Sequence, residues 1–541
     1  MKNINVKQSI YSILISVFVT SFLMACTDNQ KSTKMNVEKQ KTTIVTVTMP
    51  REPAKINPMI YGQMFEDCND EIIYGGIVGK QGEPRPHIDE MLKPLQIPIM
   101  RWPGGTFIHE YHWENGIGPV DKRPVVDIQH WGGIENYRFG TDEFLQWCNK
   151  MGVEPYLNFN MANSPTGGTL EDALNWIEYT NGSTDTPYGN KRATNGHAAP
   201  YGVKYWGIGN ENYGPWGVHN QETAAEYSAR LQEWASAIRA KYSDLKLLAV
   251  GHTLDWDKTI LLQNGTLIDM LTQHYYVFSQ LKNDSILEPL STLFAPAKME
   301  AHLVELSSLL NDMNDKLERQ ANPITLSIDE WNNRHQVFSD DQFMFTRNDL
   351  RRQFDVAVTA GMLNAFIRQC AIVEMANYIF PVNGHGLVRT IGEDDGFRTP
   401  TYYLFELYRQ MMIGEQMDID IDGPGVNTSE LDFFIEGDAS EINLGDHALA
   451  FVDGAAVLAN DGYINIALTN RSPDTAAEVK LNYPENYMPE KKWEITHPNI
   501  NAFNSADNRD EITPREETLN SKQKTFEIAP CGWVLIRLKK V

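Results

Sequence analysis

A regular alternation of short apolar runs and amphipathic stretches occupies most of the chain and limits the folds that it can form. Eight apolar runs, each long enough for one buried strand, lie at 60–65, 97–102, 153–159, 203–208, 245–251, 268–276, 324–328 and 373–380. Near-continuous apolar runs of this length are typical of parallel strands that are buried on both faces.

The segments between these runs have the periodicity of helices that pack on a sheet. The clearest follows the fourth run, where Tyr227, Leu231 and Trp234 lie four and three positions apart and share one helical face. Thr169, three positions before Asp172, predicts the start of another helix after the third run, because these side chains can bond each other's backbone N–H groups.

Strand–helix units repeated in this way predict an α/β fold, a (β/α)8 TIM barrel, over residues 56–412. A doubly wound open sheet is the alternative architecture. It is disfavoured because no glycine-rich phosphate-binding turn follows the first run.

The pattern changes after residue 412, where short alternating strands replace the strand–helix units. Ile464, Ile466 and Leu468 alternate with less apolar residues, and Pro, Asn and Asp separate the runs. We therefore expect an all-β antiparallel sandwich, jelly-roll-like, over 413–541. The N-terminal segment 43–55 contains one further strand, which is expected to join the sandwich because a single strand is not stable alone.

The first residues have the composition of a targeting segment. Lys2 and Lys7 precede an apolar stretch, and LMAC at 23–26 resembles the lipobox of bacterial lipoproteins. This predicts a signal peptide over 1–25, a lipid anchor on Cys26, a flexible tether over 26–42 and a location in the cell envelope, facing the periplasm or the cell surface. An ordinary signal peptide with an incidental cysteine is the alternative.

The overall charge bears on the partners that the protein can have. A formal net charge of −24 and a pI near 5.0 argue against a nucleic-acid partner, because phosphates would be repelled. Beyond the N-terminal stretch no apolar run approaches the roughly 20 residues of a membrane-spanning helix. Contact with the membrane is therefore expected only through the lipid anchor.

Polar and charged residues stand where the predicted strands end, which is the edge of a TIM barrel that carries its chemistry. Glu211 follows the fourth strand and Glu330 the seventh, so we expect the two carboxylates to face each other across the barrel mouth. A pair of carboxylates on either side of a pocket is what glycoside hydrolysis requires. Other polar residues at strand ends include Glu66, Arg101, Asn210, His274 and Tyr276.

Several longer motifs resemble glycoside hydrolase family 51, best known for α-L-arabinofuranosidases. They are IYGQMFED (60–67), RWPGGTF (101–107), YHWENGIGP (111–119), HWGGIENYRFGTDEF (130–144), VKYWGIGNENYGPW (203–216), QHYY (273–276), SIDEWN (327–332) and NINAFNS (499–505). The resemblance covers residues 43–541. It implies a retaining enzyme that releases terminal α-L-arabinofuranosyl residues from arabinan, arabinoxylan or related oligosaccharides, without cofactor or metal, and that could form a homo-oligomer.

The resemblance also implies a role for each matching residue. Glu211 corresponds to the general acid/base and Glu330 to the nucleophile; Glu211, beside the charge of Glu330, is expected to begin the reaction protonated. Asn210 corresponds to the residue that binds the hydroxyl next to the anomeric carbon. Glu66 and Arg101 match residues of the sugar subsite, and Arg101 is expected to keep the nucleophile ionised.

Four further side chains are expected around the sugar, and two departures leave the exact sugar open. His274 and Tyr276 are placed beside the nucleophile, and Trp131 and Trp216 are expected to form aromatic walls. Thr106 stands where many members have a sugar-binding asparagine, and Asp67 follows Glu66 where histidine is common. A galactofuranoside, or an endo-β-1,4-glucan or xylan, is therefore an alternative substrate.

Two other classes of function are alternatives. His109 and His112, with Glu110 between them, suggest a metal-dependent hydrolase, but the spacing is not that of the helical H-E-x-x-H motif and the stretch reads as a loop. A non-catalytic glycan-binding lipoprotein is the other alternative. The presence of both Glu211 and Glu330 argues against it.

Overall fold

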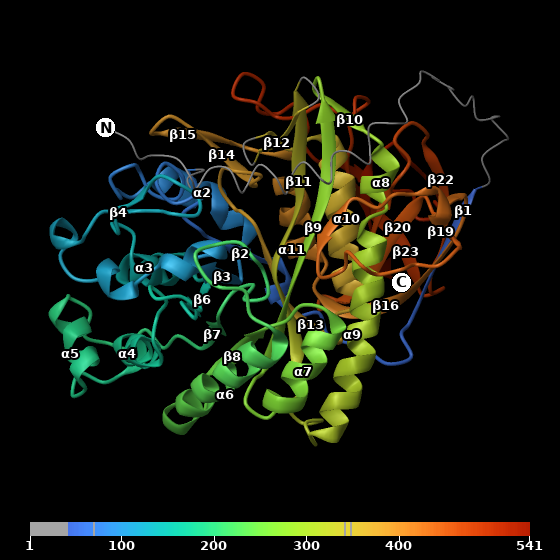
Figure 1. Cartoon of the computed structure of the whole chain (residues 1–541). Helices are drawn as coiled ribbons and strands as arrows, with labels where there is room; N and C mark the ends of the chain where they lie inside the picture. The colour runs from blue at the N-terminus through green and yellow to red at the C-terminus, as the bar shows by residue number, and fades with distance from the viewer. Residues whose placement is uncertain (1–41, 69–70, 340–341, 347–348) are drawn as a thin grey trace, which may run out of the picture. The chain divides into compact units, whose positions relative to one another are not determined.

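The computed structural model describes residues 42–541 apart from 69–70, 340–341 and 347–348. Its central feature is a closed barrel of parallel strands (Figure 1). The strands follow one another around the ring in chain order: β2 (Gly62–Met64), β3 (Ile99–Trp102), β6 (Glu154–Phe159), β7 (Tyr205–Ile208), β8 (Lys246–Val250), β9 (Met270–Lys282), β11 (Thr325–Ser339) and β13 (Val373–Tyr378). Pairing of β13 with β2 closes the ring. The predicted barrel and its eight strands are confirmed.

Helices follow these strands along the chain: α2 (Pro86–Leu92), α3 (Thr141–Met151), α4 (Leu170–Asn181), α6 (Ala224–Lys241), α7 (Leu254–Asn264), α9 (Pro296–Lys316), α10 (Gln353–Arg368) and α11 (Pro400–Met411). Helix α4 begins where predicted: the Thr169 hydroxyl accepts from the Asp172 N–H, and the Asp172 carboxylate accepts from the Thr169 N–H. Helix α6 buries its predicted face of Tyr227, Leu231 and Trp234.

Two barrel strands are longer than the sequence predicted. We expected the sixth and seventh strands to end at residues 276 and 328, but β9 and β11 continue to Lys282 and Ser339 and pair with each other beyond the barrel. Polar residues of this extension are buried because they bind one another: Ser279 donates to Asn333 at 2.9 Å. A hydropathy pattern does not detect such a strand.

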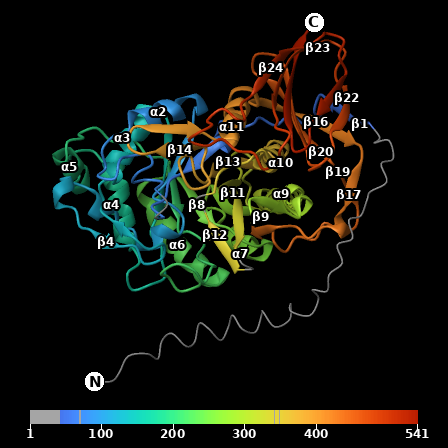
Figure 2. The ribbon, with the colours of Figure 1, turned by 90° about the horizontal axis from the view of Figure 1, so that it is seen from above.

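A sheet-rich domain contains the remaining long strands, β16 (Gly414–Asp422), β20 (Val452–Ala459), β21 (Ile464–Asn470), β22 (Ala477–Asn482), β23 (Tyr487–Ile495), β24 (Arg515–Thr518), β25 (Thr525–Ile528) and β26 (Trp533–Lys540). The first half of β16 pairs with β20 and the second half with β1 (Thr43–Thr48), so β16 connects two layers. Val45 and Val479 of one layer share a core with Ile466 and Ile536 of the other. Figure 2 shows this domain beside α10 and α11.

The N-terminal strand enters this domain in an unexpected direction. β1 lies between β16 and β22, antiparallel to the first and parallel to the second. The sheet domain therefore contains one parallel pairing, that of β1 with β22, among its antiparallel ones. No tight hairpin joins β1 to β22, because they come from opposite ends of the chain, so either direction is allowed.

Short elements occupy the connections: α5 (Pro187–Thr194), α8 (Pro289–Leu293), β4 (Val126–Asp127), β5 (Ile134–Glu135), β10 (Ser285–Leu287), β12 (Gln342–Thr346), β14 (Val388–Ile391), β15 (Asp395–Arg398), β17 (Gly425–Asn427), β18 (Ile435–Gly437) and β19 (Ala448–Ala450). In the described part of the chain, no helix combines the length and apolar character needed to cross a membrane. The predicted signal peptide, Cys26 and almost all of the tether lie outside the described residues.

Candidate active site

The carboxyl ends of the barrel strands surround a cavity of about 490 Å³. Its lining includes seven residues that the sequence predicted: Glu66, Thr106, Trp131, Glu211, Trp216, Tyr276 and Glu330. Arg101, Asn210 and His274 are buried next to the cavity: Arg101 bonds Glu330, His274 bonds Glu211, and Asn210 bonds Arg101. The sequence did not predict the other lining residues, His130, Tyr213, His252, Arg334, Ile379, Phe380, Glu436, Gly437 and Ser440.

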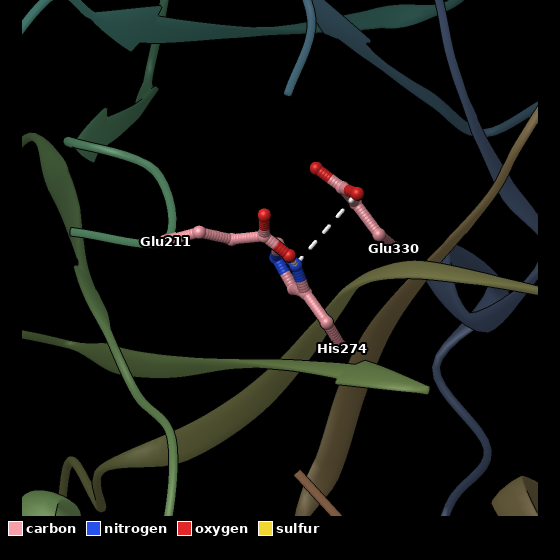
Figure 3. Close-up of side chains that lie close together, drawn as sticks. All are labelled: Glu211, His274 and Glu330. Carbon is pink, nitrogen blue, oxygen red and sulfur yellow. Dashed lines mark hydrogen bonds and ion pairs between the residues drawn. The ribbon is translucent and has the colours of Figure 1, made fainter. Parts of the chain in front are cut away.

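The two glutamates converge on one point, with His274 between them (Figure 3). One carboxylate oxygen of Glu211, one of Glu330 and a ring nitrogen of His274 all lie within 4.8 Å of one another. Retaining glycosidases hold their carboxyl groups about 5 Å apart, whereas inverting enzymes leave about 6.5–9.5 Å for a water molecule. The separation found here therefore fits direct attack by one carboxylate on a sugar that the other protonates.

A β-bulge brings two adjacent acidic residues to the same cation. The register of β11 against β9 shifts between Ile328 and Glu330, so Asp329 is an extra residue in its strand. Consecutive side chains of a regular strand point to opposite faces, but a bulge re-aims them. As a result both Asp329 and Glu330 reach Arg101.

Arg101 binds three oxygen-bearing side chains from within the barrel. Its side chain is only 1% exposed, and its Nη1 donates to Glu330 Oε1 at 2.8 Å. Nη2 donates to Asn210 Oδ1 at 2.7 Å, and Nε forms an ion pair with Asp329 at 3.2 Å. The expected pairing of Arg101 with Glu330 is confirmed, and the same cation also orients the residue before Glu211.

The surroundings of Glu330 favour its ionised form. Burial alone would raise the pKa of this carboxyl, but the charges of His274 and Arg101, with hydrogen bonds from Tyr276 and Arg101, lower it to about 2. The Tyr276 hydroxyl donates to Glu330 Oε2. Glu330 is therefore a carboxylate at any physiological pH.

His274 shares a proton with Glu211. Its Nδ1 lies 2.6 Å from Glu211 Oε1 and 3.7 Å from Glu330 Oε2. Burial would lower the pKa of His274, but the negative charges of Glu330 and Glu211 raise it to about 9. His274 is consequently a cation at neutral pH, and its Nδ1–H can donate to Glu211 Oε1.

An unusual backbone conformation directs Glu211 into the cavity. Its φ of +43° lies in the left-handed region, which non-glycine residues rarely adopt. The neighbouring Asn212 holds the loop: its Oδ1 accepts from the Asn210 N–H at 3.1 Å, and its Nδ2 donates to Glu222 at 2.7 Å. Asn212 is thus a structural residue of the site, although nothing in the sequence pattern predicted this role.

The two glycines of the RWPGGTF motif allow the loop after β3 to lie against the carboxylates. Gly104 has a φ of +141°, and a Cβ there would lie 2.5 Å from Glu66 Cγ; one on Gly105 would lie 2.3 Å from Glu330 Oε1. The Glu66 carboxylate accepts from the Phe107 N–H at 2.9 Å and from Trp131 Nε1 at 3.2 Å. Larger residues at either glycine would displace an acidic side chain.

The two histidines of the metal-site alternative do not converge. His109 is fully buried with Nε2 on the Asn210 carbonyl at 2.8 Å, and burial, with a smaller effect of His219, lowers its pKa to about 3. His112 is exposed, and the Glu110 carboxylate accepts from the backbone N–H groups of residues 129 and 130. His109 supports the backbone beside Glu211 instead.

Known proteins similar to this chain share both of its halves. Residues 91–288 match the family described as "Alpha-L-arabinofuranosidase 1 domain", and residues 329–531 match "Alpha-L-arabinofuranosidase C-terminal domain". A relative from Aspergillus terreus, named "Probable alpha-L-arabinofuranosidase C", is 31% identical over 94% of this chain and 100% of its own length. The "Intracellular exo-alpha-L-arabinofuranosidase" of Bacteroides ovatus is 28% identical over 89% of this chain and 92% of its own.

Solved structures agree with these relatives. The family 51 α-L-arabinofuranosidase of Thermotoga petrophila superposes with a TM-score of 0.78 at 29% identity, over 92% of this chain and all of that one. The arabinose complex of the Thermotoga maritima α-L-arabinofuranosidase gives 0.77 at 29% identity, over 93% and 100%. Since the similarity spans both the barrel and the sheet domain, the chain belongs to the α-L-arabinofuranosidases of glycoside hydrolase family 51.

Proposed function

We propose that the protein is a glycoside hydrolase that releases terminal α-L-arabinofuranosyl residues from arabinose-containing plant polysaccharides or oligosaccharides, with retention of anomeric configuration. The observation that carries the proposal is the approach of the Glu211 and Glu330 carboxylates to within 4.8 Å. The names of the similar proteins support the choice of sugar.

The reaction takes two displacements. In the first, a Glu330 oxygen forms a bond to the anomeric carbon while the bond from that carbon to the leaving oxygen breaks, and Glu211 gives its proton to the leaving oxygen. In the second, Glu211, now a carboxylate, removes a proton from water as the water oxygen attacks the anomeric carbon. Glu330 leaves as a carboxylate and Glu211 is protonated again, so the enzyme returns to its starting state.

The bond between His274 and Glu211 supplies the proton for the first step. An imidazolium beside a carboxylate and an imidazole beside a carboxylic acid hold the same number of protons, so the proton can pass along the 2.6 Å contact to Glu211. Substrate binding favours the second form, because the glycosidic oxygen offers Glu211 an acceptor. The pair can thus carry one proton in the resting enzyme and deliver it where it is needed.

Several side chains are placed to bind the sugar. Asn210 gives its oxygen to Arg101, while its buried Nδ2 has no protein partner among the described residues and can donate to the hydroxyl next to the anomeric carbon. Glu66 presents a carboxylate for other hydroxyls. Trp131 and Trp216 provide aromatic walls, and Thr106 occupies the position where many family members have asparagine.

Replacing each glutamate should separate the two roles. Glu211→Gln is expected to lower kcat/KM for an arabino-oligosaccharide by roughly 10²–10⁴-fold, because its poor leaving group needs the proton. For an aryl α-L-arabinofuranoside with an acidic phenol the loss should be about tenfold or less. Glu330→Gln should abolish hydrolysis of both. Steady-state kinetics on the two substrates provides the measurement.

Glu374→Gln serves as the control, because Glu374 lies near the start of β13, at the opposite end of the barrel, where it accepts from Thr325. It should leave both substrates unaffected. Aryl galactofuranoside, β-1,4-glucan and xylan, assayed with the wild-type enzyme, test the alternative substrates. Equal losses on both substrates in Glu211→Gln would contradict the assigned roles.

The pH dependence of kcat/KM should report the titration of Glu330 and that of the proton between His274 and Glu211. For the wild-type enzyme kcat/KM should show no acid limb from Glu330 above about pH 4 and should fall near pH 9, where the shared proton is lost. His274→Asn removes a cation that lowers the pKa of Glu330, so the acid limb should move to higher pH and the limb near pH 9 should disappear. Tyr276→Phe removes a hydrogen bond to Glu330 but no charge.

Tyr276→Phe should therefore shift only the acid limb upward and keep the limb near pH 9. Circular dichroism over the same pH range distinguishes loss of activity from unfolding. A His274→Asn profile that superposes on the wild-type profile would show that His274 does not set either titration.

We also propose that the enzyme is a lipoprotein of the cell envelope, anchored through Cys26. The basic start, the apolar stretch and LMAC at 23–26 support this. Mass spectrometry of the N-terminal peptide from a bacterial host should show a lipid on Cys26 and no residues 1–25, and Cys26→Ala should move the enzyme from the membrane to the soluble fraction. An unmodified Cys26 or an intact residue 1–25 segment would refute the anchor.

A further inference from the structure

A segment from beyond the barrel forms one side of the active site. β18 pairs antiparallel with β9, with Ile435 opposite Val277 and Gly437 opposite Tyr275. β11 occupies one edge of β9 along its whole length, and β8 occupies the other edge only at residues 270–272. β18 therefore continues the wall of the barrel on the edge that β8 leaves, although the sequence placed these residues in the sandwich.

Asp438, directly after β18, is bonded to His274 in both directions. The Asp438 N–H donates to the His274 carbonyl at 3.0 Å, and Asp438 Oδ2 accepts from the His274 N–H at 2.7 Å. Gly437 permits this approach: its φ is +87°, and a Cβ there would lie 2.2 Å from the His274 carbonyl oxygen. The backbone of His274 is thus fixed by a residue of another part of the chain.

The two hydrogen bonds between Asp438 and the His274 backbone also affect Glu211, the proposed acid/base. The His274 side chain bonds Glu211 Oε1 at 2.6 Å, so the position of its backbone determines where the imidazole meets the carboxylate. The Asp438 side chain itself has no exposed surface and is not part of the cavity lining. Asp438 therefore does not contact a sugar in the cavity, and its hydrogen bonds reach the site through its neighbours.

A second series of contacts joins the other carboxylate oxygen of Asp438 to Glu211. Oδ1 contacts His252 Nδ1 at 2.7 Å, and the His252 ring lies flat on Tyr213, with centroids 3.7 Å apart and an interplanar angle of 6°. The edge of Tyr213 meets Trp216, whose Nε1 donates to Glu211 Oε2. Each oxygen of the Glu211 carboxylate is thus connected to one oxygen of Asp438.

We propose that Asp438 is a positioning residue that holds Glu211 in its reactive orientation through His274 and through the His252–Tyr213–Trp216 stack. The inference rests on the proposed function, in which Glu211 is the acid/base. A carboxylate is suited to the role because it accepts two hydrogen bonds at once, and burial keeps those bonds free of competition from water. General-acid catalysis depends on this kind of alignment, since a displacement of about 1 Å can cost roughly 10²-fold in rate.

Asp438→Ala tests the proposal by leaving-group dependence. For an arabino-oligosaccharide we expect kcat/KM to fall roughly 10–100-fold, mainly through kcat, whereas an aryl arabinofuranoside with an acidic phenol should lose about threefold or less. Asp438→Asn keeps one acceptor oxygen and should lose less. The limb near pH 9 should also move, since it reports the proton between His274 and Glu211. If Asp438 had a purely structural role, Asp438→Ala would lower kcat/KM for both substrates by the same factor.

Asp453→Asn is the matched control, because Asp453 is another buried carboxylate of the sheet domain that binds barrel residues, Asn364 at 2.9 Å and Arg368 at 3.2 Å, away from the site. Asp453→Asn should leave the ratio of kcat/KM for the two substrates unchanged even if it lowers the melting temperature. If Asp438→Ala does not fold, His252→Phe keeps an aromatic ring against Tyr213 and removes the bond to Asp438. The His252→Phe variant should lose less kcat/KM for the oligosaccharide than Asp438→Ala does, and its kcat/KM for the aryl substrate should not fall.

Glu211→Gln, assayed in parallel, separates this inference from the proposed function. If Glu211→Gln shows no leaving-group dependence, the proposed function fails. If Glu211→Gln shows it while Asp438→Ala and His252→Phe keep the wild-type ratio and pH profile, only the positioning role is overturned.

Discussion

The buried guanidinium of Arg101 is the interaction on which the geometry of the site depends. An enclosed cation is costly unless opposite charges and acceptors surround it, and here two carboxylates and an amide oxygen do so. The same contacts orient Glu330 directly and Glu211 through the preceding Asn210. Because Asp329 and Glu330 reach the cation only through the bulge in β11, the fold of that strand and the charge state of the nucleophile are linked.

Much of this arrangement could be predicted from the sequence. The barrel strands are buried on both faces, so their residues form apolar runs that stand out from the helices between them. Glu211 and Glu330 interrupt that pattern at strand ends, where a carboxylate has no use in packing. Arg101 and Tyr276 stand at equivalent strand ends, so residue order predicts that they lie at the barrel mouth, whereas their contacts with Glu330 were implied by the resemblance to family 51.

The rest depends on contacts between distant segments. The extension of β11 is polar in sequence, and His335 is buried in it only because Asp349 and Asp355 bind its two ring nitrogens. β18 is three residues long and has no periodicity, so nothing local assigns it to β9. Asp438 is likewise one acidic residue among many, and its place beside His274 follows from tertiary structure.

The central claim is that a sugar bound at the barrel mouth is attacked by Glu330 from a distance that leaves no room for an intervening water. Hydrolysis of an aryl α-L-arabinofuranoside in the presence of methanol tests it most directly, because methanol then intercepts the glycosyl-enzyme. Proton NMR of the product at early times should show methyl α-L-arabinofuranoside, the retained anomer. Formation of the β anomer would mean a single displacement and would contradict the account.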